Sequence, residues 1–62
     1  MTIKFKRESL NMTQGQLAES LGVKRSTLAM WETGRNFPRV EILIKMSELF
    51  NCTIDELLKG EK

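Results

Sequence analysis

The chain has 62 residues, a single cysteine, no histidine and a net charge of +2. Its length predicts one domain, residues 1–62, while the lone cysteine excludes an internal disulfide and the lack of histidine removes the commonest metal ligand and general base, so we expect no cofactor and no metal. No apolar run approaches the ~18 residues of a membrane span and no signal peptide is recognisable, so we expect a cytoplasmic protein without a membrane partner.

The first predicted helix runs from about Thr2 to Leu10. Ile3, Arg7 and Leu10 recur along it at the spacing of one helix face. Ile3 and Leu10 are therefore assigned to the core. Phe5 lies well off this face, and its place is left open.

The second predicted helix begins at a capping box. The Thr13 hydroxyl can accept the Gln16 amide N–H, and the Gln16 side chain can reach back to the Thr13 N–H, so the helix starts at about Gln14. Its apolar face, about two turns long, consists of Leu17, Ala18 and Leu21. Gly22 can adopt a positive φ without steric cost, so the chain turns there.

The third predicted helix runs from Lys24 or Arg25 to Thr33. Leu28 and Trp31 lie three residues apart and face inward. Trp31 could instead be a stacking residue, but its register with Leu28 favours core packing. At ~100° per residue the opposite face consists of Ser26, Ala29, Met30 and Thr33. This face carries no acidic residue, so a polyanion can approach it without like-charge repulsion.

Two cations, Lys24 and Arg25, open this helix. The helix macrodipole disfavours cations there by roughly 0.3–1 kcal/mol, and a lysine cannot cap amide groups as Ser or Thr would, a further loss of about 1 kcal/mol. A phosphate bound at this helix end would reverse the sign of the penalty. The alternative is that both residues are ordinary solvated charges.

The fourth predicted helix runs from about Arg39 to Phe50. Gly34, suited to a left-handed helix cap, opens the loop before it, and Pro38 is suited to its entrance. Its core stripe consists of Val40, Leu43 and Phe50. The helix is apolar almost all round, which indicates a second buried surface. A second stripe, extended by the fifth helix, consists of Ile42, Met46, Leu49 and Leu58. We expect this stripe to meet its symmetry mate in a two-fold dimer; alternatively, it covers helices of the same monomer.

The fifth predicted helix begins at a second capping box, formed by Thr53 and Glu56, and runs to about Lys59, with Gly60 as its end. Cys52 precedes it and is expected to be a small buried hydrophobe rather than a reactive or ligating thiol. All five segments are helical, so the expected fold class is all-α. The predicted core consists of Ile3, Leu10, Leu17, Ala18, Leu21, Leu28, Trp31, Val40, Leu43, Phe50, Ile54 and Leu57.

Charge is unevenly distributed along the chain. Residues 1–39 carry seven basic and three acidic side chains, whereas residues 40–62 carry three basic and five acidic ones. This asymmetry indicates one face that meets phosphate and another that does not, although chance is the alternative in so short a chain. No cluster of nucleophile and base, or of metal ligands, supports an enzyme.

Taken together, these positions resemble the Cro/repressor-type (XRE-type) helix-turn-helix family. The resemblance rests on a pattern at fixed spacing that consists of Thr13, Gln14, Leu17, Ala18, Gly22, Val23, Arg25, Ser26, Thr27, Leu28, Trp31, Glu32 and Gly34. It continues through Pro38 and the segment FNCTIDELL, so it covers almost the whole chain. It implies a compact five-helix lambda-repressor-like domain and an ion pair between Arg7 and Glu32.

The resemblance also implies a function. We expect sequence-specific binding of double-stranded DNA by a small transcriptional regulator, a repressor that acts as a homodimer on a near-palindromic operator, with two recognition helices about one DNA turn, ~34 Å, apart. No small-molecule effector is evident. The alternative is an antitoxin-like or antirepressor module that uses the same fold to bind protein.

Carried over by resemblance, the third helix reads bases and helix N-termini hold phosphates. The expected base-reading residues are Lys24, Arg25, Ser26, Thr27 and Met30. The expected phosphate contacts are Gln14, Arg35, Asn36 and Arg39. Arg25 can donate two hydrogen bonds to a guanine, which discriminates between bases by about 1–3 kcal/mol. The chain departs from the family pattern at Lys6, usually aliphatic, and at Lys24 and Arg39, usually small hydroxyl residues.

Overall fold

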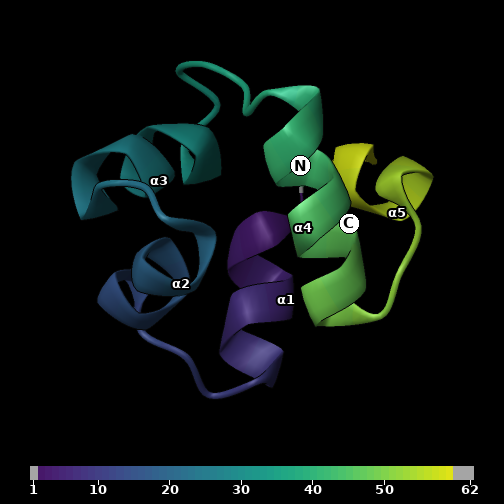
Figure 1. Ribbon diagram of the computed structural model, residues 1–62, viewed down its shortest axis with the longest axis horizontal. Coiled ribbons are helices and arrows are strands. Elements are labelled where there is room, and N and C mark those ends of the chain that lie inside the picture. The colour runs from purple at the N-terminus through teal and green to yellow at the C-terminus, as the bar shows by residue number, and fades with distance from the viewer. Residues whose placement is uncertain (1, 60–62) are drawn as a thin grey trace.

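The computed structural model describes residues 2–59, and within that range the chain forms five α-helices and no strand (Figure 1). The helices are α1 (Ile3–Ser9), α2 (Gln14–Leu21), α3 (Arg25–Glu32), α4 (Val40–Phe50) and α5 (Ile54–Leu58). The all-α expectation is therefore confirmed, with helix ends close to those predicted. Lys59 follows α5 in an extended conformation. Gly60, the predicted end of that helix, lies outside the described residues.

Two capping boxes fix where α2 and α5 begin. Thr13 Oγ1 accepts the Gln16 N–H at 3.0 Å, and Gln16 Oε1 accepts the Thr13 N–H at 2.8 Å. Thr53 and Glu56 repeat this exchange at 3.1 and 3.0 Å. Gly22 ends α2 with a φ of +73°, in the left-handed region that favours glycine. These predictions, all based on residues close in sequence, are confirmed.

The five helices pack against one another around a common core. α2 packs on α3 and α4, α1 packs on α3, and α5 packs on α4 (Figure 1). The start of α1 is also joined to α5, because the Thr2 N–H donates to the Leu57 carbonyl at 3.1 Å and Thr2 Oγ1 donates to the Glu56 carbonyl at 3.1 Å. Figure 1 shows α3 and α5 on opposite sides of the molecule. Among residues 2–59, no helix is long and apolar enough to cross a membrane.

The core lies where the helices meet. Its buried apolar side chains are Ile3, Leu17, Ala18, Leu21, Leu28, Trp31, Leu43, Met46 and Leu57. Partly buried side chains that pack against it are Met12, Val23, Ile42, Phe50, Cys52 and Ile54. Trp31 is therefore a core residue, which confirms the packing role over the stacking role.

Two residues predicted for the core lie outside it. Leu10 is 47% exposed because α1 ends at Ser9 and Leu10 forms its C-cap. Val40 is 65% exposed. Val40 and Met46 both lie three residues from Leu43, so the helical periodicity allows either of them to share the buried face with Leu43. α4 packs with Met46 inward, and at ~100° per residue this turns Val40 toward solvent.

The predicted dimer stripe on α4 is wrong in part. Met46 is fully buried inside the monomer, so it has no surface to offer a second copy. Ile42 is half-buried and packs against the same core. For these two residues the alternative holds, since they cover surface within one monomer. Leu49 and Leu58 are exposed, and their role stays a prediction.

Candidate nucleic-acid interface

The front of α3 is an exposed polar surface. Lys24 is the N-cap in an extended conformation, and the helix begins at Arg25. Of the residues expected to read bases, Thr27 is half-buried and the exposed ones are Lys24, Arg25, Ser26 and Met30. Leu28 and Trp31 are buried on the other side of the helix. α3 is thus held by its apolar side and presents the expected base-reading side outward.

The N-termini of α3 and α4 lack side-chain caps. Lys24 and Arg39 are their N-cap residues, and neither side chain makes a capping hydrogen bond. At α2, by contrast, Thr13 accepts a first-turn amide. The first amides of a helix have no intrahelical acceptor, so these two ends combine free N–H groups, the positive end of a helix dipole and a cationic side chain. That combination suits an anion such as a phosphate.

The loop between α3 and α4 carries two residues expected to bind phosphate, Arg35 and Asn36, and a third, Arg39, occupies the N-cap position of α4. All three side chains are exposed. The Arg35 backbone N–H donates to the Met30 carbonyl at 2.9 Å, which ties the loop to the end of α3. The fourth expected contact, Gln14, differs from these because it is half-buried and bonded within the protein.

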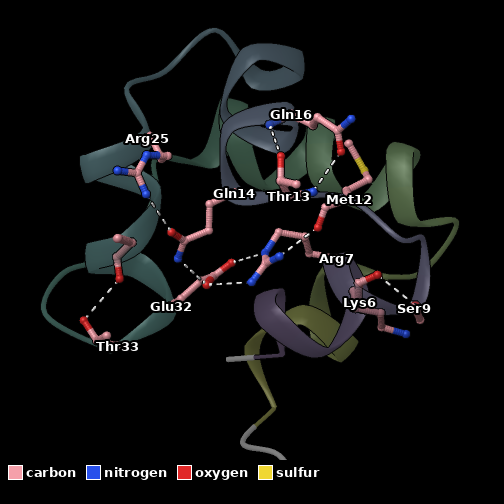
Figure 2. A network of polar contacts seen from close by, with 11 residues as sticks. Lys6, Arg7, Ser9, Met12, Thr13, Gln14, Gln16, Arg25, Glu32 and Thr33 are labelled. Atoms are coloured by element: carbon pink, nitrogen blue, oxygen red, sulfur yellow. Dashed lines mark hydrogen bonds and ion pairs between the residues drawn. The ribbon is translucent and has the colours of Figure 1, made fainter.

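A polar network connects α1, α2 and α3 behind this surface (Figure 2). Arg7 Nε donates to Glu32 Oε2 at 2.7 Å, and Arg7 Nη2 donates to Glu32 Oε1 at 3.4 Å. Arg7 Nη1 donates to the Met12 carbonyl at 2.7 Å. The hydrogen bond to Glu32 raises the pKa of Arg7, against the opposing effect of burial. The ion pair implied by the resemblance is therefore present.

Gln14 extends this network to the surface (Figure 2). Its Nε2 donates to Glu32 Oε1 at 2.9 Å, and its Oε1 accepts from Arg25 Nη1 at 3.4 Å. The sequence analysis missed this link, because no helical or strand spacing connects positions so far apart in the chain. The Glu32 side chain is only 4% exposed and paired with Arg7, so its charge does not oppose an anion at the front of α3.

Two other kinds of site, a metal centre and a reactive thiol, were considered for the described residues. Within residues 2–59, no group of three or more His, Cys, Asp or Glu could hold a metal ion. Cys52 is a half-buried free thiol. Burial raises the pKa of Cys52, and Glu56 adds to this while Lys6 opposes it, so the neutral thiol is favoured over the reactive thiolate.

Helix-turn-helix proteins are similar to this chain. The helix-turn-helix family profile matches residues 3–57. The chain is 48% identical over 56 residues to the HTH-type transcriptional activator BcrR of Enterococcus faecalis, a match that covers 90% of this chain and 28% of the relative. It is 36% identical over 55 residues to an uncharacterized HTH-type transcriptional regulator of Archaeoglobus fulgidus, covering 89% of this chain and 78% of that one.

A phage protein is also similar. The chain is 33% identical over 51 residues to the cryptic phage CTXphi transcriptional repressor RstR of Vibrio cholerae, which covers 82% of this chain and 46% of the repressor. The chain thus spans about a quarter of the activator and less than half of the repressor. No solved structure matches the chain.

Proposed function

This chain belongs to the helix-turn-helix family, and we propose that it binds double-stranded DNA in a sequence-specific manner as a small transcriptional regulator of the Cro/repressor type. The observation that carries the proposal is the exposed front of α3, where Lys24 is the N-cap, Arg25 and Ser26 stand on the first turn and Met30 lies one turn after Ser26. An α-helix fits the major groove, where arginine, serine and apolar side chains can distinguish base edges.

Phosphate contacts would set the position of α3 in the groove. Arg35 and Asn36 are exposed in the loop that precedes α4. Arg39 and Lys24 are the N-cap residues of α4 and α3, and neither side chain makes a capping hydrogen bond. Cations and free helix amides at these places suit the sugar-phosphate strand that borders the groove. Gln14 can add a phosphate contact only through the Nε2 hydrogen that Glu32 does not take.

We further propose that the chain acts as a homodimer on a near-palindromic operator, with a contact surface other than the one the sequence suggested. Val40 and Ile44 are both exposed and lie one turn apart on α4. Because Met46 and Ile42 serve the core of the monomer, Val40 and Ile44 are the apolar side chains that α4 leaves together on one side. Leu49 lies about 140° around the helix from Ile44, so a single two-fold contact would not use both.

Repression is the regulatory outcome that we propose. A protein bound across a promoter blocks it by occupancy alone, which requires only the DNA-binding surface described above. The similar proteins are named both as an activator and as a repressor, so the sign of regulation has to be measured on a reporter promoter. An antitoxin-like or antirepressor module, which would bind protein through the same fold, is the second candidate.

One experiment separates these candidates. Duplexes selected from a random library by the full chain would be compared with an unrelated duplex by fluorescence anisotropy at physiological salt. A specific regulator binds the selected duplex about a thousandfold or more tightly than the unrelated one. Lys45→Ala, which removes an exposed cation from the middle of α4, serves as a control that leaves this preference unchanged. Equal binding to both duplexes would favour the protein-binding module.

A further inference from the structure

We infer that each half-site bound by α3 contains two guanines and one thymine within a stretch of about four base pairs. Arg25 and Lys24 read the guanines, and Met30 reads the thymine. This inference rests on the proposed function, because it specifies which bases the exposed front of α3 selects. The types of side chain that this front holds, and the types that it lacks, support it.

Two adjacent cations at the start of α3 are available to bases. Lys24 and Arg25 are exposed, and among residues 2–59 neither side chain forms an ion pair. Arg25 Nη1 donates to Gln14 Oε1 at 3.4 Å, which leaves the other donors of the guanidinium free (Figure 2). Both side chains only donate hydrogen bonds, and guanine is the base whose major-groove edge presents two acceptors, O6 and N7. Each cation therefore favours a guanine.

Met30 is the exposed apolar side chain on the same front. It is 36% exposed and lies one turn after Ser26, while Ala29 beside it is half-buried. In the major groove the C5-methyl group of thymine is the apolar group that such a side chain can contact. Lys24 and Met30 lie six residues apart, about 9 Å along an α-helix, which corresponds to about three base steps. The thymine therefore falls in the same short stretch of DNA as the guanines.

Side chains that read adenine or cytosine are missing from the exposed front of α3. Adenine is read by the amide of asparagine or glutamine, and cytosine by a carboxylate. α3 contains no amide side chain, and its one carboxylate, Glu32, is 4% exposed and paired with Arg7. The Gln14 amide on α2 is bonded on both sides within the protein, to Glu32 and to Arg25 (Figure 2). Ser26 can donate to or accept from any base edge, so guanine and thymine are the bases that this front selects.

The test changes single groups of the DNA, so it does not depend on the folding of a variant. The full chain selects duplexes from a random library, and sequencing gives the bases of the half-site. The selected duplex is then made with 7-deazaguanine, which lacks the N7 acceptor, at one guanine at a time, or with uracil, which lacks the C5-methyl group, in place of the thymine. In fluorescence anisotropy at physiological salt, 7-deazaguanine should lower the affinity by at least about fivefold and uracil by about threefold.

Three variants assign each base to its side chain. Arg25→Gln is expected to change one selected guanine to adenine, because an amide pairs with adenine N6 and N7. Lys24→Ala should relax the preference for the other guanine, and Met30→Ser the preference for thymine. In each variant the matching analogue in the wild-type site no longer lowers the affinity. Lys45→Ala, on α4, is the control that keeps the wild-type response to all three analogues.

Several outcomes would overturn the inference while the proposed function stands. One is a selected half-site in which Arg25→Gln and Lys24→Ala alter the preference at no guanine. Another is an affinity that 7-deazaguanine leaves unchanged at both guanines. An affinity that uracil leaves unchanged would overturn the assignment of thymine to Met30. If the wild type prefers no duplex, the proposed function fails together with the inference.

Discussion

The guanidinium of Arg7 and the carboxylate of Glu32 form a nearly buried ion pair that joins α1 to the last turn of α3, with Nε and Oε2 2.7 Å apart. Glu32 Oε1 also accepts from Gln14 at 2.9 Å, so both carboxylate oxygens are satisfied within the protein. The pair therefore fixes the position of α3 relative to α1 and neutralises the one acidic side chain of α3.

Removing one partner of this pair should destabilise the fold. Arg7→Met leaves the Glu32 carboxylate buried and uncompensated, so the free energy of unfolding is expected to fall by about 3–5 kcal/mol in urea denaturation. The double variant Arg7→Met with Glu32→Met removes both charges and should lose less than the single variant. A single variant with the same free energy of unfolding as the wild type would show that the ion pair does not contribute to the stability of the fold.

Two arginines near the front of α3 should have different effects on DNA binding. Arg25→Ala is expected to weaken binding to the best site by about 1–3 kcal/mol and to relax the preference at one base pair per half-site. Arg35→Ala should weaken binding evenly across sequences and lower the slope of affinity against salt by about one. Site selection from random duplexes and salt titration measure these effects. An unchanged preferred sequence for Arg25→Ala would remove it from the base-reading residues.

Two glycine substitutions on α2 should change stability in opposite directions. Gly15 lies inside the helix, and a Cβ there meets only ordinary contacts at 3.8 and 3.9 Å, so Gly15→Ala is expected to raise the free energy of unfolding by about 0.4–1 kcal/mol. Gly22 has a φ of +73°, where a side chain is strained, so Gly22→Ala should lower it by about 1 kcal/mol. Urea denaturation of both variants measures the difference; a loss of stability in Gly15→Ala would contradict the ordinary van der Waals contacts found for a Cβ there.

The dimer surface can be tested with a matched pair on α4. Ile44 and Leu49 are 44% and 40% exposed and lie on different sides of the helix. Ile44→Glu is expected to shift the protein to monomer in sedimentation velocity, whereas Leu49→Glu should dimerise as the wild type does. The reverse result would return the interface to the side of α4 that the sequence suggested. A wild type that stays monomeric at high concentration would exclude a stable dimer in the absence of DNA.

The thiol of Cys52 should react slowly in the folded protein. Burial raises the pKa of Cys52, so at pH 8 a smaller fraction is thiolate than in the unfolded chain, and thiolate is the nucleophile. A raised pKa stabilises the fold below the unfolded pKa, and this contribution is lost as the pH rises through the folded pKa. Alkylation by iodoacetamide at pH 8 should thus be slower than in the same chain in urea. Equal rates would show that Cys52 is not protected.

The helices themselves follow from residues close in sequence. Thr13 and Gln16, and likewise Thr53 and Glu56, exchange hydrogen bonds across three residues, so the beginnings of α2 and α5 are specified locally. Gly22 supplies the left-handed cap of α2. The front of α3 could also be predicted, because burial of Leu28 and Trp31 on one side leaves the other side exposed.

Two features were decided only by the tertiary structure. The rotation of α4 is one of them, since Val40 and Met46 are spaced equally from Leu43, and only the space available against the other helices selected Met46 for the core. The link from Glu32 through Gln14 to Arg25 is the other. Local periodicity specifies which residues share a helix face, but the rotation of that face toward its neighbours, and the polar side chains that meet across helices, depend on how all five helices pack together.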